Sequence, residues 1–94
     1  AAVEELIKGI AKEEGVNNIR ANSIAIGVIE TGIFLRLKEQ GVFDKAWIEG
    51  VKSVLPLKRF GQPEEVAQMA VFLASNRAAY TTGQLIPVDG GFGV

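Results

Sequence analysis

Two short apolar segments that read as strands, one near each end of the chain, limit the fold more than any other feature. The first, residues 19–25, ends just before Gly27, and the second, residues 84–88, follows a turn at Thr81-Thr82-Gly83. Helical patterns fill the long connection between them. Strands joined by such a crossover lie parallel, and the connection is right-handed. The sequence therefore predicts one βαβ unit of an α/β fold.

Three helical regions accompany these strands. Residues 1–15 carry apolar side chains at i, i+3, i+4 and i+7, and Gly15 closes the pattern. Residues 32–55 show two short amphipathic patterns punctuated by glycine. Residues 63–75 begin with Pro63, which suits a first helical turn, and are apolar almost all round. A helix of that kind is expected to pack against a sheet and to be covered again on its outer side.

The predicted sheet is incomplete. Parallel sheets are buried on both faces and are rarely two strands wide, so we expect the first strand to leave an unpaired edge. Pro87 cannot donate to a ladder, which places the second strand at or near a sheet edge. The helix over residues 1–15 starts without a capping residue, which indicates a beginning further upstream. We therefore expect a fragment of a larger domain, whose uncovered apolar surfaces favour a homo-oligomer.

Composition excludes several classes of function. The net charge is -1 and no run of like charge occurs, so neither nucleic acid nor an anionic membrane is an expected partner. The chain has no cysteine and no histidine, so disulfides and cysteine-ligated metals are excluded and no metal site is predicted. No apolar run approaches the ~20 residues that span a bilayer. A cytoplasmic location is the expectation.

Four motifs follow one another in a fixed order. They are Ile19-Arg20-Ala21-Asn22-Ser23-Ile24 with Gly27 and Thr31, then Pro56-Leu57-Lys58-Arg59-Phe60-Gly61-Gln62-Pro63-Glu64-Glu65-Val66-Ala67, then Thr82-Gly83-Gln84, then Val88-Asp89-Gly90-Gly91. Together they resemble the carboxyl-terminal part of a short-chain dehydrogenase/reductase, over essentially the whole chain. The resemblance implies the carboxyl-terminal βαβ portion of a doubly wound parallel (Rossmann-type) sheet, with an N-terminal helix and short lid helices. Residues 1–94 would form a single fragment of that domain.

The same resemblance implies an NAD(P)-dependent oxidoreductase that acts on a small-molecule alcohol or carbonyl substrate. In that family the glycine-rich phosphate loop, the catalytic Ser and the Tyr-x-x-x-Lys pair all come earlier than the part matched here. Tyr80 is the only tyrosine and has no lysine four residues on. No catalytic residue is therefore predicted within these residues, the choice between NAD and NADP stays open, and the 94 residues alone are expected to be inactive and to bind NAD(P)H weakly or not at all.

The cofactor contact that the resemblance places in this chain runs from Ile26 to Thr31. Gly27 would let the loop backbone lie flat against a ligand. The Ile29 backbone and the Thr31 hydroxyl would hold the nicotinamide carboxamide and so orient the ring. Two alternatives stand beside this role: Thr31 also fits the cap of the following helix, and a glycine after a strand often serves an ordinary turn. The family usually has proline where this chain has Ile26.

Residues 32–55 resemble the family's mobile substrate region. Phe34, Leu35 and Trp47 would then make an apolar lid over the substrate. The alternative is that these side chains belong to the hydrophobic core.

Two functional hypotheses follow. In the first, the chain is part of an NAD(P)-dependent dehydrogenase or reductase whose catalytic residues lie outside it. In the second, it is a non-catalytic, self-associating fragment or a stand-alone truncated interaction module. The coding sequence before Ala1 distinguishes them, because a Tyr-x-x-x-Lys pair and a glycine-rich turn there would support the first hypothesis.

Overall fold

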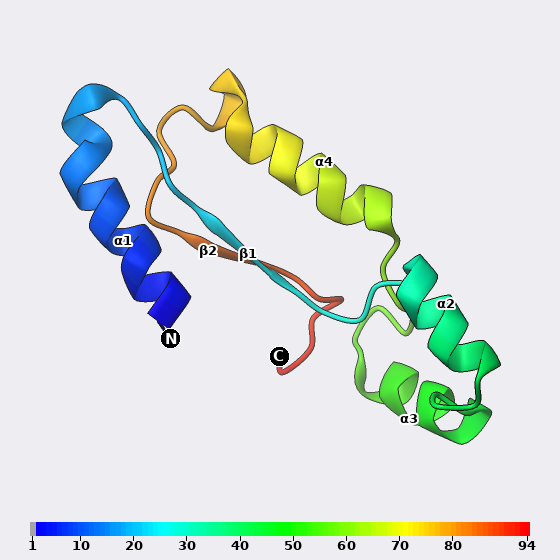
Figure 1. The fold of residues 1–94 in the computed structure, drawn as a ribbon. Helices are drawn as coiled ribbons and strands as arrows, with labels where there is room; N and C mark the ends of the chain where they lie inside the picture. Colours follow the sequence, from blue (N-terminus) through cyan, green and yellow to red (C-terminus); the bar gives the residue numbers. More distant parts are fainter. Residues whose placement is uncertain (1) are drawn as a thin grey trace. The chain divides into compact units, whose positions relative to one another are not determined.

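A computed structural model describes residues 2–94 as an α/β chain (Figure 1). The two strands pair with each other, and two one-turn 3₁₀ helices accompany four α-helices. In chain order the elements are α1 (Ala2–Glu14), η1 (Gly15–Asn17), β1 (Ser23–Ile26), α2 (Gly32–Glu39), α3 (Lys45–Val54), α4 (Pro63–Ala74), η2 (Asn76–Ala78) and β2 (Leu85–Val88).

The two strands are parallel. Ser23 N–H donates to the Gln84 carbonyl at 2.9 Å, and Gly27 N–H donates to the Val88 carbonyl at 3.0 Å. The residue numbers rise together on both chains, as they must in a parallel ladder. The predicted βαβ portion of a parallel α/β sheet is confirmed.

The first strand differs from the sequence prediction of residues 19–25, because β1 starts only at Ser23. Ahead of it one backbone bond remains, from Gly83 N–H to the Ala21 carbonyl at 2.7 Å, and side chains take part in two further bonds. Ala21 N–H donates to the Thr82 hydroxyl at 3.1 Å, and the Asn22 Oδ1 atom accepts from Gln84 N–H at 3.0 Å. At the other end the strand continues to Ile26.

The region 32–55 contains two separate helices with a turn at Gly41, whose φ of 78° lies in the left-handed range. Each helix has a side chain as its N-cap. Thr31 Oγ1 accepts from Phe34 N–H before α2, and Asp44 Oδ1 accepts from Trp47 N–H at 2.8 Å before α3. These caps satisfy amide groups that the first turn of a helix leaves without partners.

The described chain divides into two compact units. One combines Ala1–Ala25 with Ala67–Pro87, and the other combines Ile26–Val66 with Val88–Val94. The prediction that residues 1–94 form a single fragment of one domain remains a prediction.

In the first unit, Arg20 joins the end of α4 to the chain leading into β1. Its guanidinium donates to the Leu73 carbonyl at 2.7 Å, the Ser75 carbonyl at 3.1 Å and the Thr81 carbonyl at 3.3 Å. The last carbonyls of a helix have no partners within it, so a cation there supplies both hydrogen bonds and a favourable charge. Asn22 Nδ2 donates to the same Thr81 carbonyl at 3.1 Å.

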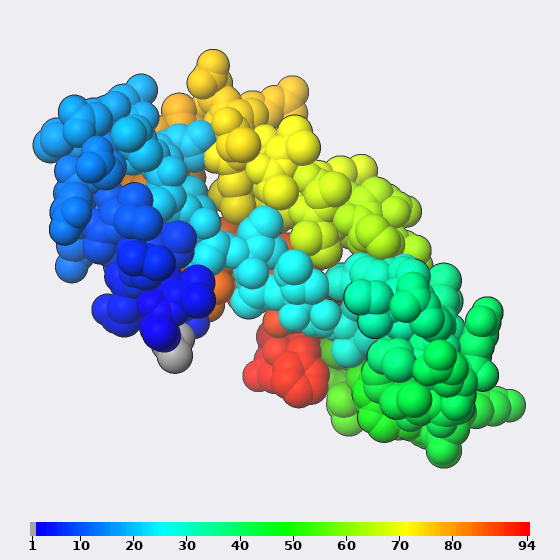
Figure 2. All heavy atoms as spheres, viewed as in Figure 1, coloured from blue at the N-terminus to red at the C-terminus, as the bar shows by residue number. Residues whose placement is uncertain are grey.

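In the second unit, an aromatic core joins α2, α3 and the loop before α4. Phe34, Ile48, Leu55 and Phe60 are buried together, with Phe60 only 2% exposed. The Phe34 and Phe60 rings meet edge to face with centroids 5.2 Å apart. The space-filling view shows the side chains of α2 and α3 as one contiguous mass (Figure 2).

Replacement of Arg20 tests the carbonyl cap. We expect Arg20→Ala to lower the free energy of unfolding by about 1–3 kcal/mol, because it leaves partly buried carbonyls without donors. Urea denaturation measures the change. Arg77→Ala is the matched control, since Arg77 is an exposed arginine near the same helix end. Equal midpoints for the two variants would contradict the cap.

Candidate functional site

The loop predicted to hold a cofactor, residues 26–31, starts at a close approach between two backbones. A Cβ atom added to Gly27 would lie 2.7 Å from Asp89 Cα and 2.9 Å from Asp89 Cβ. Gly27 is not among the residues with positive φ. The approach of Asp89, and not a left-handed backbone angle, therefore accounts for glycine at this position, and the contact of Gly27 with a ligand stays a prediction. Glycine is needed because any side chain would collide with the turn after β2.

On its other side the loop is joined to Gly61 by an isolated parallel bridge centred on Ile29. Gly61 N–H donates to the Val28 carbonyl at 3.0 Å, and Glu30 N–H donates to the Gly61 carbonyl at 2.9 Å. The polar backbone groups of Ile29 itself point away from Gly61, as the alternation along an extended chain requires.

Ile29 thus presents a backbone donor. Its carbonyl accepts from Thr31 N–H at 2.8 Å, while its N–H has no partner among residues 2–94. Ile29 is only partly exposed. An unpaired N–H at such a position is available to an acceptor on a ligand.

Thr31 lies at the end of this loop and caps α2. Its backbone is extended, with φ of -89° and ψ of 175°, and its Oγ1 atom accepts from Phe34 N–H at 3.3 Å. This geometry agrees with the capping alternative. A hydroxyl that accepts one bond still has its own hydrogen to donate, so the cap leaves a donor free on an exposed side chain.

The loop before α4 is fixed by an ion pair that sequence reasoning missed. Arg59 Nη1 and Nη2 donate to Glu65 Oε1 and Oε2 at 2.7 and 2.8 Å, and Gln62 N–H donates to Glu65 Oε1 at 2.9 Å. The bonds from the Arg59 guanidinium, followed by the Gln62 amide, lower the pKa of Glu65 to about 2. The Glu65 carboxylate in turn raises the pKa of Arg59. The spacing of Gln62 and Glu65, which is that of a capping box, was the available signal.

The predicted lid residues lie in different environments. Phe34 is 7% exposed and belongs to the aromatic core, whereas Leu35 is 46% exposed on α2. Trp47 is 39% exposed and stacks on Phe43 with ring centroids 4.4 Å apart. Phe34 therefore fits the core alternative, whereas Leu35 and Trp47 keep exposed apolar surface.

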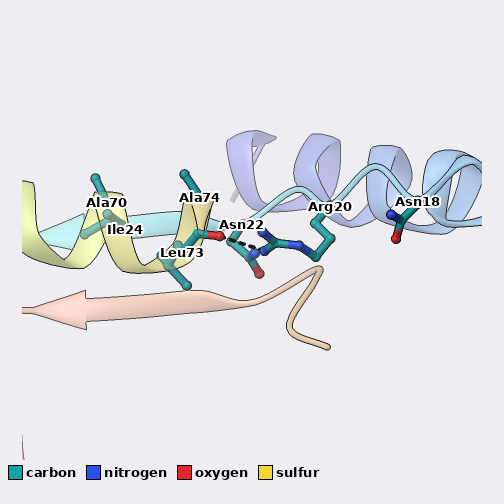
Figure 3. A pocket seen from close by; sticks show the side chains of 7 residues that line it. All are labelled: Asn18, Arg20, Asn22, Ile24, Ala70, Leu73 and Ala74. Carbon is teal, nitrogen blue, oxygen red and sulfur yellow. Dashed lines mark hydrogen bonds between the residues drawn. The ribbon is translucent and has the colours of Figure 1, made fainter. Parts of the chain in front are cut away.

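A pocket of about 400 Å³ lies in the first unit (Figure 3). Figure 3 shows the Arg20 side chain reaching toward the end of α4 at one side of it. None of the predicted cofactor or lid residues lines this pocket. The lining residues are Asn18, Arg20, Asn22, Ile24, Ala70, Leu73 and Ala74.

The described part of the chain holds neither a metal-binding cluster nor a membrane-spanning helix. No group of three or more histidine, cysteine, aspartate or glutamate residues within residues 2–94 could hold a metal ion. Over the same residues, no helix has the length and hydropathy to cross a membrane.

Comparison with known proteins decides the family. A family model described as "Enoyl-(Acyl carrier protein) reductase" matches residues 1–93. The chain belongs to the short-chain dehydrogenase/reductase family. The 3-oxoacyl-[acyl-carrier-protein] reductase FabG of Thermotoga maritima is 46% identical over 91 residues, which are 97% of this chain and 35% of the relative. The 3alpha-hydroxysteroid dehydrogenase of Mediterraneibacter gnavus is 40% identical over 89 residues, 95% of this chain and 33% of the relative.

A solved structure of the family agrees in fold. The structure of 4-hydroxyisoleucine dehydrogenase complexed with NADH matches with a TM-score of 0.84 and 36% identity, covering 98% of this chain and 36% of that one. This short-chain dehydrogenase/reductase chain spans about a third of the length of the curated relatives named above.

Substitution of Gly27 tests the close approach to Asp89. We expect Gly27→Ala to destabilise the protein by about 1–3 kcal/mol, because the new methyl group overlaps the Asp89 backbone. Thermal unfolding measures the difference. Gly50→Ala is the control, since a Cβ placed there in α3 has no described atom within 4 Å apart from its chain neighbours and the backbone of its own helix. A Gly27→Ala protein as stable as the Gly50→Ala protein would contradict the steric account.

Proposed function

We propose that residues 26–31 form the nicotinamide side of the cofactor site in an NAD(P)-dependent oxidoreductase. The complete gene product would transfer hydride between the nicotinamide ring and the alcohol or carbonyl group of a small molecule. The observation that carries the proposal is the Ile29 N–H, which has no partner among residues 2–94 and lies two residues before the Thr31 hydroxyl. The backbone that holds it is bound to Gly61 on one side and starts at the close contact of Gly27 with Asp89.

These two groups fit the nicotinamide carboxamide. Its oxygen can accept from the Ile29 N–H, and its remaining polar groups suit the Thr31 hydroxyl, which can both donate and accept. Holding the carboxamide fixes the rotation of the ring and therefore the face from which hydride leaves. The role of the chain is to orient the cofactor, while the nicotinamide ring, when bound, supplies or accepts the hydride.

The proton transfer that accompanies hydride transfer is assigned to residues outside these 94. The chain lacks histidine and cysteine, and its one tyrosine, Tyr80, is fully exposed in the first unit. The NADH bound by 4-hydroxyisoleucine dehydrogenase supports a nicotinamide cofactor. The family members named above are reductases and dehydrogenases of different compounds, which supports only the class of alcohol and carbonyl substrates.

Leu35 and Trp47 are proposed to contribute apolar surface toward the substrate. Both are partly exposed on helices whose other faces hold the buried Phe34 and Ile48. In this proposal Phe34 supports the lid from the core rather than contacting the substrate.

Thr31 gives the direct test. In the complete gene product we expect Thr31→Val to weaken NADH or NADPH binding by roughly tenfold, because one hydrogen bond of about 1.4 kcal/mol is lost. Thr31→Ser keeps the hydroxyl and should bind as the wild type does. Fluorescence titration with each cofactor measures the dissociation constant.

Asp44→Ala is the control for loss of a helix cap, because Asp44 caps α3 in the same way that Thr31 caps α2. It should lower stability and leave cofactor binding unchanged. If the wild type binds neither cofactor, or if Thr31→Val and Asp44→Ala affect binding equally, the proposal fails.

We also propose that the protein is a homo-oligomer. In the first unit, large apolar side chains lie exposed on helices, among them Val3 and Leu6 on α1 and Val71 and Phe72 on α4. Surfaces of this kind mark contacts between proteins. Light scattering of the purified protein should give a mass at a multiple of the chain mass, and a monodisperse monomer would contradict the proposal.

A further inference from the structure

We infer that Glu65 and Arg59 are positioning residues for the cofactor, acting through Gly61 on the direction of the Ile29 N–H. The inference rests on the proposed function of residues 26–31. Within the described residues 2–94, neither side chain has a hydrogen bond to that loop. Both hold the short backbone segment that has such bonds.

Peptide groups on either side of Gly61 are bound by these two side chains. Arg59 Nη1 donates to the Phe60 carbonyl at 3.1 Å, on the amino side of Gly61. The Glu65 carboxylate accepts from Gln62 N–H at 2.9 Å, on its carboxyl side. The two side chains are joined by the bidentate pair at 2.7 and 2.8 Å. The orientation of the Gly61 backbone is thus fixed at both ends.

Gly61 in turn fixes the backbone of the loop at residues 26–31 through hydrogen bonds. Its N–H and carbonyl both bind residues on either side of Ile29, at 3.0 and 2.9 Å. A Cβ on Gly61 would lie 2.7 Å from Ile29 Cδ1, so the Ile29 side chain lies directly over this glycine. In an extended chain the polar groups of successive residues point to opposite sides. A bridge that fixes Val28 and Glu30 therefore also fixes the direction of the Ile29 N–H.

Phe60, the residue before Gly61, packs against α2, the helix that Thr31 caps. Phe60 is buried and meets Phe34 of α2 edge to face at 5.2 Å. The two groups proposed to hold the carboxamide are therefore positioned from one segment: Ile29 through Gly61, and Thr31 through the contact between Phe60 and α2.

Stability is a weak explanation for the ion pair. The Arg59 and Glu65 side chains remain 52% and 38% exposed, and exposed pairs contribute little to folding. Two parallel hydrogen bonds in a planar fork do, however, restrict geometry strongly. The arrangement suits a role in orientation, in which a small displacement of the loop would misalign the ring.

Glu65→Ala in the complete gene product tests the inference, because it removes both the pair with Arg59 and the acceptor for Gln62. Glu65→Gln keeps an acceptor for the Gln62 amide but loses the charge of the pair, and it serves if Glu65→Ala fails to fold. Glu64→Ala is the matched control, since Glu64 is the neighbouring exposed carboxylate in the same helical turn.

Three readouts are taken: amide hydrogen exchange at Glu30 and Gly61, kcat, and the stereospecificity of hydride transfer from a cofactor deuterated on one face. We expect Glu65→Ala to speed exchange at both amides, to lower kcat roughly tenfold and to allow transfer from the wrong face of the ring. Glu65→Gln should show the same changes to a smaller degree, and Glu64→Ala none.

A variant that is only less stable would still transfer hydride from the correct face of the ring. The stereospecificity of hydride transfer therefore separates a positioning role from a structural one. Unchanged exchange, kcat and stereospecificity in Glu65→Ala would overturn the inference while leaving the proposed function intact. The proposed function fails separately if the wild type binds no cofactor. In that case, faster exchange at Glu30 and Gly61 in Glu65→Ala would show that the ion pair holds only the structure of the loop, and the inference would be overturned as well.

Discussion

The bridge between Gly61 and the backbone on either side of Ile29 is the interaction on which the candidate site depends. β1 ends at Ile26, so without further support the chain beyond it would be an ordinary surface loop. Gly61 makes it a continuation of extended backbone, with two hydrogen bonds near 3 Å. The close contact of Gly27 with Asp89 holds the start of the same segment. An amide donor left unpaired in a segment fixed in this way is pre-organised for a ligand.

In the proposed nicotinamide site, this arrangement provides groups that orient a ring and no group that transfers a proton. The chain supplies a rigid backbone donor and a hydroxyl, neither of which changes its charge during a reaction. Such groups orient a ring, whereas proton transfer needs titratable groups of suitable pKa. The lowered pKa of Glu65 keeps its carboxylate ionised, and an ionised carboxylate keeps its bonds to Arg59 and Gln62.

The sequence predicted the features that local patterns determine. The parallel βαβ arrangement followed from two strands and a long helical crossover, and the capping alternative for Thr31 followed from residue type and position. Contacts between distant residues were not predictable. Arg20 binds the Leu73 carbonyl, 53 residues away, and nothing near Arg20 in the sequence indicates that partner.

Other differences have equally specific causes. The start of β1 was placed too early because the Asn22 and Thr82 side chains replace ladder bonds, which residue patterns do not reveal. Phe34 and Trp47 look alike in an amphipathic pattern, and both rings lie near Phe43 and Phe60. Only the three-dimensional packing shows that 7% of the first residue and 39% of the second stay exposed. At Gly27 the steric constraint comes from Asp89, near the far end of the chain, and nothing close to Gly27 in the sequence indicates that contact.

The most direct test of the central claim is the hydrogen exchange of the Ile29 amide in the complete gene product, measured by NMR with and without saturating NADH or NADPH. The account predicts that this amide exchanges readily in the free protein and becomes protected when the cofactor binds, because its N–H then donates to the carboxamide. A cofactor that binds and leaves Ile29 exchange unchanged would contradict the account.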